Sequence, residues 1–177
     1  MKTRLALLLA LTASVACASC GYAPVHSASA EHLHVAISES KIPDAVASDE
    51  VLAGAREELA RAGSLASGDG YPRCEIEILR ADDASEGIAA VPDADGRLLP
   101  QSRATRVGLV ARAWIVRKAG GDHERDTGDV RAFETVSVAP DAHVATFRHS
   151  DALRVAGRRV GKRLAARIMG IPSANDE

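Results

Sequence analysis

The stretch RATRVGLVARAWIVR, Arg103 to Arg117, decides the fold. Apolar residues recur at every second position, which is the period of a β-strand with two different faces. One face carries only aliphatic side chains: Val107, Leu109, Ala111, Ala113 and Ile115. The other face mixes charged and apolar side chains: Arg106, Val110, Arg112, Trp114 and Val116. We therefore expect a long strand whose aliphatic face points into the core.

The segments that follow supply a partner strand and a covering helix. Residues 119–122, Ala-Gly-Gly-Asp, turn the chain, and Val130 to Val138 returns as a second strand in which Glu134 breaks the apolar pattern. A long amphipathic helix is then predicted from Asp151 to Met169, with Ser150 as its N-cap. Its apolar stripe comprises Leu153, Ala156, Gly157, Val160, Leu164 and Ile168. The stripe has the spacing of a helix that packs on a sheet.

The segments that precede the long strand read as strand, helix and strand. His32 to Ser38 alternates, and so does Cys74 to Ile78. Between them, Ser48 to Ala62 has helical apolar spacing, with Ser48 as the cap, Gly63 as the stop and Glu57 paired with Arg61 on the outside. This unit should be a right-handed crossover between parallel strands. The whole order, β-α-β-β-β-α, predicts an α+β two-layer sandwich with both helices on one face of a four-stranded mixed sheet.

Residues 81–101 leave two interpretations open. The segment holds five acids, two glycines and two prolines among scattered aliphatic residues. A connection of some 20 residues without structure of its own is unusual in a compact domain and is often functional or disordered. The alternative is a long hairpin extension that turns at Asp95-Gly96.

The N-terminus reads as an export signal. Lys2 and Arg4 precede a short apolar run, and a small-residue exit, CASC, ends on Cys20 before Gly21. The run is too short to span a bilayer, which takes about 20 apolar residues. CASC resembles the lipobox of bacterial lipoproteins, in which the cysteine is acylated and becomes the anchor. A frame ending on Cys17 is the rival for lipidation, and a plain secretory peptide is the other alternative.

These signals divide the chain into a signal peptide, 1–19, a lipidated N-terminus and tether, 20–31, a single domain, 32–170, and a tail, 171–177. Removing the signal peptide takes away Lys2 and Arg4, so the formal charge changes from −2 to −4. That balance gives no reason to expect nucleic acid. We expect no cofactor beyond the covalent lipid on Cys20.

The sequence contains little that points to a metal site or to an enzyme active site. His32 and His34 share a strand face without a cluster of further ligands, and lone Cys74 is most simply a small buried hydrophobe. The triplet Asp126-Thr127-Gly128 matches that of aspartic proteases, but the charged residues on either side of it should keep the loop exposed to solvent. No nucleophile, base and orienting group come together, so we expect neither a metal site nor catalysis.

Cations gather on the terminal helix, where no acid lies between Ala152 and Gly170. They form either a solvated face or a surface that meets an anion such as phosphate, a lipid headgroup or an acidic partner. The candidate contacts with anionic lipid are Arg158, Arg159 and Lys162 on this helix, with Arg103 and Arg106 beside the long loop as a competing set.

The chain as a whole resembles the LptE-type lipopolysaccharide-assembly lipoproteins. The resemblance lies in Cys20-Gly21-Tyr22 after the signal and in the order of segments, with residues 34–37, 51–59, 74–78 and 106–117 followed by the terminal helix. It implies two helices on a four-stranded sheet and an anchor on the periplasmic side of the outer membrane. It also implies an LptD-like β-barrel partner that inserts lipopolysaccharide, and contact with lipopolysaccharide itself. An auxiliary lipoprotein of a lipid-transport ABC system, or a secretin pilot, is the alternative.

Overall fold

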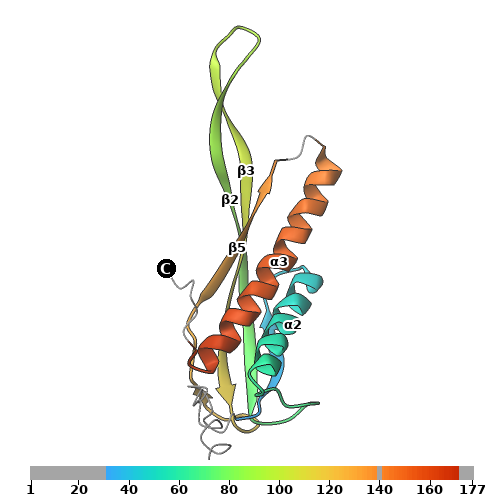
Figure 1. Cartoon of the computed structure of the whole chain (residues 1–177), viewed down its shortest axis with the longest axis vertical. Coiled ribbons are helices and arrows are strands. Elements are labelled where there is room, and N and C mark those ends of the chain that lie inside the picture. Colours follow the sequence, from blue (N-terminus) through green and yellow to red (C-terminus); the bar gives the residue numbers. More distant parts are fainter. Residues whose placement is uncertain (1–30, 139–140, 172–177) are drawn as a thin grey trace, which may run out of the picture. The chain divides into compact units, whose positions relative to one another are not determined.

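The computed structural model describes residues 31–138 and 141–171, except for the side chains of 88, 89 and 100–103. The chain divides into two units, Met1–Ala30 and Glu31–Glu177, and only the second is described. Its elements, labelled as in Figure 1, are β1 (His34–Ser40), α2 (Ala45–Arg61), β2 (Arg73–Pro92), β3 (Leu98–Val116), β4 (His123–Glu124), β5 (Val130–Ser137) and α3 (Ala142–Ile168).

The sheet has the mixed topology that the sequence predicts. β1 pairs with β2 in parallel, and β2 pairs with β3 in antiparallel register. On its other side β3 pairs antiparallel with β5 from Ala104 to Ala111 and with the two-residue β4 at its end. The α+β class is therefore confirmed, and β4 is an addition that the sequence pattern did not reveal.

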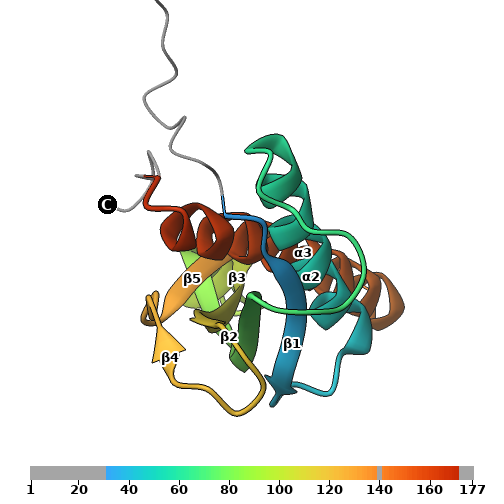
Figure 2. The same cartoon turned by 90° about the horizontal axis from the view of Figure 1, so that it is seen from below.

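Both helices cover the same face of the sheet, as Figure 2 shows from below. The aliphatic face of β3 is buried against them, because Val107, Leu109, Ala111 and Ala113 are 0% exposed. The core cluster joins these residues to the stripe of α3 and to one side of α2. The faces of the long strand are thus oriented as expected.

The two helices touch along a seam of glycines. A Cβ atom placed on Gly161 of α3 would lie 2.0 Å from the carbonyl oxygen of Val51, and one on Gly54 of α2 would lie 2.2 Å from that of Arg158. At Gly157 the corresponding distance, to the carbonyl oxygen of Ala47, is 2.8 Å. Real Cβ atoms do not approach oxygen so closely, so larger residues would force the helices apart.

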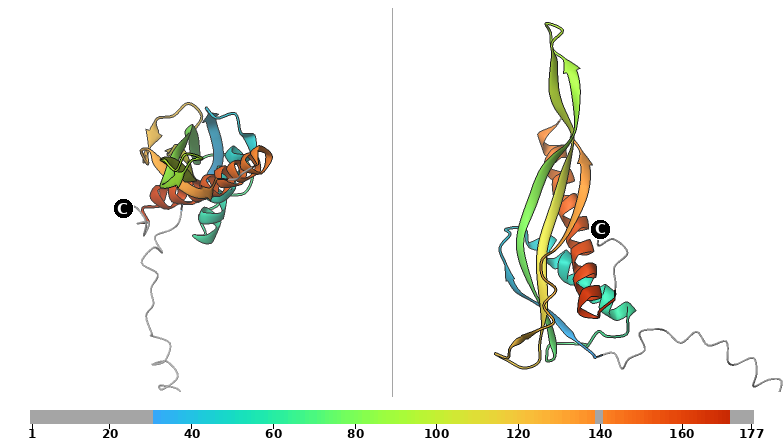
Figure 3. Two further views of the ribbon diagram at one scale, coloured as in Figure 1. Left: turned by 90° about the horizontal axis from the view of Figure 1, so that it is seen from above. Right: turned by 90° about the vertical axis from the view of Figure 1, so that its left-hand side faces the viewer.

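Residues 81–101 belong to a hairpin, the second of the two interpretations. β2 and β3 stay paired from Arg73↔Val116 to Pro92↔Leu98. In the turn, Asp93 Oδ1 accepts hydrogen bonds from the amides of Asp95, at 2.9 Å, and Arg97, at 2.8 Å, and Gly96 has a φ of 77°. Figures 1 and 3 show the distal part of the hairpin running beyond the helices.

Both helices begin earlier than predicted. Asp44 caps α2 through the amide of Ala47, and Ser48 lies inside the helix, where its hydroxyl donates to the carbonyl of Asp44. Asp141 caps α3 through the amides of His143 and Val144, so Ser150 is also internal. The first two turns of α3 are exposed, and without a buried stripe they gave no helical pattern to read.

Candidate functional site

The predicted lipidation site, Cys20, lies outside the described residues, and its acylation remains a prediction. The described part begins at Glu31, whose carboxylate forms an ion pair with Arg117 at the end of β3. Among the described helices, none is long and apolar enough to cross a membrane.

The three helix cations singled out from the sequence are all paired with acids. Arg158 reaches Glu50 at 3.1 Å and Glu57 at 3.0 Å, both on α2, and Lys162 Nζ lies 2.7 Å from Glu57. Arg158 and Lys162 are therefore part of the contact between the two helices. The predicted pair of Glu57 with Arg61 is wrong, because Arg61 instead pairs with Glu58.

The third cation points the other way. Arg159 forms an ion pair with Glu134 of β5 and donates to the carbonyl of Phe133 at 3.0 Å. Glu134 was the residue that broke the apolar pattern of its strand, and this partner accounts for it. Arg158 and Arg159 thus contact different neighbours of α3, one on α2 and the other on β5, so the trio does not form one cluster for a single anion.

The carboxyl group of Glu57 shows the electrostatic coupling between the two helices. Hydrogen bonds from Lys162 and then Arg158 lower the pKa of Glu57 from its ordinary value. Glu57 is therefore charged throughout the neutral range, and its charge is already matched by two cations. Because these ion pairs are solvent-exposed, their contribution to stability is small.

The second candidate set for anionic lipid, Arg103 and Arg106, lies on β3. Arg103 lies in β3, but its side chain is among those not described. Arg106 forms an ion pair with Glu86 of β2 at 3.0 Å, and its guanidinium lies 4.7 Å from the ring centre of Phe133. That ring crosses Gly108, where a Cβ would come within 2.3 Å of it. Arg106 is thus part of a packed cross-strand group.

A row of arginines on α3 faces the outer edge of β5. Arg163 Nη1 donates to the carbonyl of Arg131 at 2.6 Å, and Arg148 Nη1 reaches the carbonyl and hydroxyl of Ser137. With Arg159 on Phe133, the acceptors are residues 131, 133 and 137, which point to the same side of a strand. Charged side chains are a known means of blunting an edge strand. This row was not predicted; its signal in the sequence is the four-residue spacing of Arg159, Arg163 and Arg167.

The four-residue spacing of these arginines matches the spacing of the β5 carbonyls, because one helical turn is nearly as long as two strand residues. Four helix residues rise about 6 Å, and two strand residues advance about 6.6 Å. Arginines one helical turn apart therefore meet alternate carbonyls of an antiparallel strand. Beyond the strand, Arg167 Nη1 donates to the carbonyl of Thr127, in the loop before β5, at 3.3 Å.

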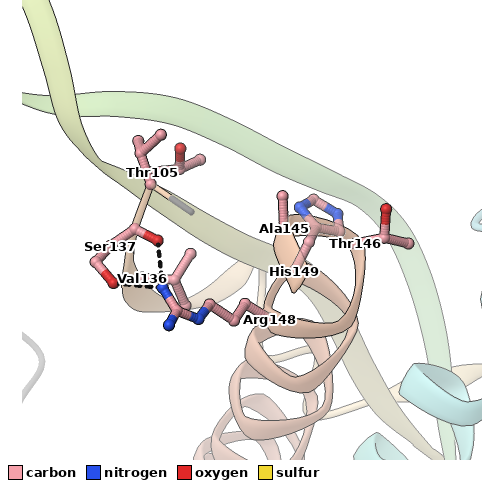
Figure 4. A pocket seen from close by; sticks show the side chains of 8 residues that line it. Thr105, Val136, Ser137, Ala145, Thr146, Arg148 and His149 are labelled. Carbon is pink, nitrogen blue, oxygen red and sulfur yellow. Dashed lines mark hydrogen bonds between the residues drawn. The ribbon is translucent and has the colours of Figure 1, made fainter. Parts of the chain in front are cut away.

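A pocket of about 340 Å³ opens where β5 ends, between the sheet and the first turns of α3. Figure 4 shows its lining: Thr105 of β3, residues 136–138 at the end of β5, and Ala145, Thr146, Arg148 and His149 of α3. Apart from Arg148 and His149 the lining is small or aliphatic. His149 Nδ1 lies 3.8 Å from Asp83 of β2.

The face of the sheet turned away from the helices holds a nearly buried carboxylate. Glu77 is 4% exposed, and it binds Lys41 at 2.6 Å and Arg112 at 2.7 Å. These hydrogen bonds, from Lys41 first, lower the pKa of Glu77. Beside them Trp114 stacks on His123, with ring centres 4.2 Å apart. Each carboxylate oxygen of Glu77 accepts a hydrogen bond from one cation, so the group is a structural contact on this face of the sheet.

The residues considered for chemistry have structural partners. Asp126 Oδ1 accepts from the amide of Gly128 at 2.7 Å, and Thr127 Oγ1 accepts from the amide of Ala113 at 2.9 Å, so the triplet fastens a loop to β3. His34 Nδ1 lies 2.9 Å from the carbonyl oxygen of Gly68. Burial raises the pKa of the Cys74 thiol to about 12, which leaves it unreactive. Within the described ranges no group of side chains could hold a metal ion.

Comparison with known proteins gives matches of structure alone. No family model and no curated protein matches the chain. A minor lipoprotein from Acinetobacter baumannii matches with a TM-score of 0.52 and 10% identity, over 80% of this chain and 92% of that one. The rare lipoprotein B from Shewanella oneidensis matches with a TM-score of 0.39 and 10% identity, over 77% of this chain and 91% of that one. The first match shows a shared fold, and the second is too weak to carry an argument.

Proposed function

We propose that this protein is an outer-membrane lipoprotein, anchored through Cys20 on the periplasmic side, that supports a lipopolysaccharide-inserting β-barrel of the LptD type. Its role is non-catalytic. The observation that carries the proposal is the combination of a lipobox-like exit at Cys20 with two helices on one face of a mixed sheet. A minor lipoprotein shares this fold, which supports the lipoprotein part of the proposal.

Direct contact with lipopolysaccharide is the secondary part of the proposal. The helix trio, Arg158, Arg159 and Lys162, is satisfied by Glu50, Glu57 and Glu134. An anionic lipid would have to compete with these carboxylates, which weighs against the trio as a phosphate site. We therefore place support of the partner before lipid binding.

Testing the trio requires neutral substitutions. Charge reversal would set like charges against Glu57 and Glu134, so a loss of binding could reflect a damaged fold. Arg158→Gln, Arg159→Gln and Lys162→Gln together should leave lipopolysaccharide affinity unchanged if the trio is structural. A salt-dependent loss of affinity at unchanged melting temperature would instead restore it as a lipid contact.

The main test is co-purification from detergent-solubilised outer membranes, with wild type, Cys20→Ala and Cys17→Ala in parallel. We expect wild type and Cys17→Ala to retain a large β-barrel protein, and Cys20→Ala to be lost from the membrane fraction. Recovery of an ABC permease or a secretin in place of a barrel would favour the alternative functions. Recovery of none of these from intact membranes would contradict the proposal.

A further inference from the structure

One edge of the sheet is left open beside the pocket. β5 pairs with β3 only from Ala111 to Ala104, where it meets Ser137, whereas β3 continues to Leu98. Within the described residues no strand pairs with this last part of β3 on the side of β5. We call residues 98–103 of β3, on that side, the open edge.

The direction of the backbone groups follows from the arginine row. In an antiparallel pair the N–H and C=O of one residue point to the same side, and the side alternates along the strand. The carbonyls of Arg131, Phe133 and Ser137 face α3, so the even-numbered residues of β5 face β3. They meet odd-numbered residues of β3, as in Val136↔Thr105. Leu99, Gln101 and Arg103 therefore direct their backbone groups at the open edge.

The pocket lies where side chains of an added strand would point. A strand that continued the line of β5 would run past Ser137, and its side chains on the helix side would meet the pocket lined by Thr105, Ala145 and Thr146. Leu99 lies on the same face of β3 as Thr105, because the two are an even number of positions apart, and it is 53% exposed. Leu98 is 68% exposed. Backbone pairing with a pocket for alternate side chains is how peptides add to sheet edges.

Charge indicates what kind of strand fits. Arg97 stands at the far end of the open edge and Arg148 at the end of β5. Neither forms an ion pair with a carboxylate in the described part of the chain; Arg148 donates to Ser137 alone. These guanidiniums would meet acids at both ends of an added segment. A second copy of β3 would instead bring a further cation, its own Arg97, to the interface.

The opposite edge of the hairpin is a poorer template. β1 leaves β2 after Ser40↔Ile78, so β2 is also unpaired on that side among the described strands. However, Gly87 in the distal part of β2 has a φ of 67°, which is not a strand conformation. Such a residue interrupts the regular spacing of an edge.

We propose that the open edge accepts an extended segment of a partner protein, antiparallel to β3, with apolar side chains at alternate positions and an acidic residue at each end. The segment pairs with Leu99, Gln101 and Arg103 and places an apolar side chain in the pocket. The proposal does not depend on the partner being a barrel.

The test uses the full lipidated protein in detergent and the peptide Glu-Val-Thr-Val-Thr-Val-Glu, capped at both ends. We expect binding that slows amide exchange in residues 99–103, and binding about tenfold weaker or more for the peptide N-methylated on the face that meets β3. Gln101→Pro, which removes an edge N–H, should abolish binding, and Gln101→Ala, which keeps it, should not.

Three outcomes would overturn the proposal. The first is no binding at millimolar peptide, and the second is binding that ignores both N-methylation and Gln101→Pro. The third is self-association that Gln101→Pro removes, because the occupant would then be a second copy. If Gln101→Pro fails to fold, the N-methylated peptide still decides. A barrel that co-purifies while the peptide does not bind would leave the proposed function standing and this inference refuted.

Discussion

The guanidinium of Arg163 donates to the backbone carbonyl of Arg131, with a distance of 2.6 Å between Nη1 and oxygen. This contact ties the C-terminal half of α3 to the outer edge of β5. Arg159 likewise donates to the backbone carbonyl of Phe133. The two arginines therefore occupy backbone carbonyls of β5 that could otherwise pair with another strand.

We predict that Arg159→Ala with Arg163→Ala makes the protein self-associate. The outer carbonyls of β5 would lose their donors, and an uncovered edge strand is a template for pairing between chains. Sedimentation velocity should show concentration-dependent oligomers. Arg154→Ala is the matched control, because this residue lies on the same helix and contacts only Asp151 among the described acids. Monomers throughout would mean that the row is not needed to protect the edge.

The glycine seam predicts a ranking of stabilities. Gly161→Ala should cost about 1–3 kcal/mol or more, because its Cβ would meet the carbonyl oxygen of Val51 at 2.0 Å. Gly157→Ala should cost less, since the corresponding distance to Ala47 is 2.8 Å. Denaturant unfolding of both variants measures the difference. Equal or increased stability in both would show that the helices separate freely.

Leu109→Asp should prevent folding. The side chain is 0% exposed in the middle of the core, and an unpaired buried charge costs several kcal/mol against a total stability of about 5–15 kcal/mol. Circular dichroism should show no cooperative melt. Phe147→Asp, at a position that is 73% exposed, should melt like wild type. A folded Leu109→Asp protein would contradict the placement of this face.

Glu77 predicts a dependence of stability on pH. Its pKa is lowered in the folded state, so its contribution is present above the ordinary glutamate pKa and is lost as the pH falls through the lowered value. The denaturant concentration at the unfolding midpoint should therefore decrease as the pH is lowered from about 6 to about 3. The decrease should be smaller in Glu77→Gln. The control is Glu124→Gln, which removes an exposed ion pair with Arg117. Identical pH profiles for all three proteins would refute this role.

Cys20→Ala should abolish incorporation of labelled palmitate and retention in the membrane. Cys20 ends the lipobox-like exit, and Cys74, the cysteine in the described part, is buried. Cys17→Ala should remain labelled. Label retained by Cys20→Ala and lost from Cys17→Ala would move the modification to the rival frame.

The fold could be predicted because its signals are local. Alternation in residues 103–117 identified both faces of β3, and the stripe from Leu153 to Ile168 located the buried part of α3. The first turns of α3 have no stripe because little packs on them, and only Asp141 marked the start. The hairpin could be predicted only as one of two alternatives. Asp95-Gly96 is a turn signal, but the flanking residues alternate too weakly to distinguish paired strands from a loop.

The role of the charged residues could not be predicted in the same way. A helix sequence shows which residues share a flank, but it does not show what lies across from them. Glu57 therefore seemed to pair with Arg61 on its own helix, whereas its partners are on α3. The absence of acids between Ala152 and Gly170 suggested unpaired cations, yet the carboxylates that pair with Arg158, Arg159 and Lys162 come from α2 and β5.

The stacking of Trp114 on His123 gives the protein a built-in optical probe. Trp114 is the only tryptophan in the chain, and it sits at the opposite end of β3 from Leu98. Its emission should change when the domain unfolds or when the segment around β4 detaches. Occupation of the open edge should leave the emission unaltered. Fluorescence can therefore separate damage to the domain from events at its far end in a single sample, without a label.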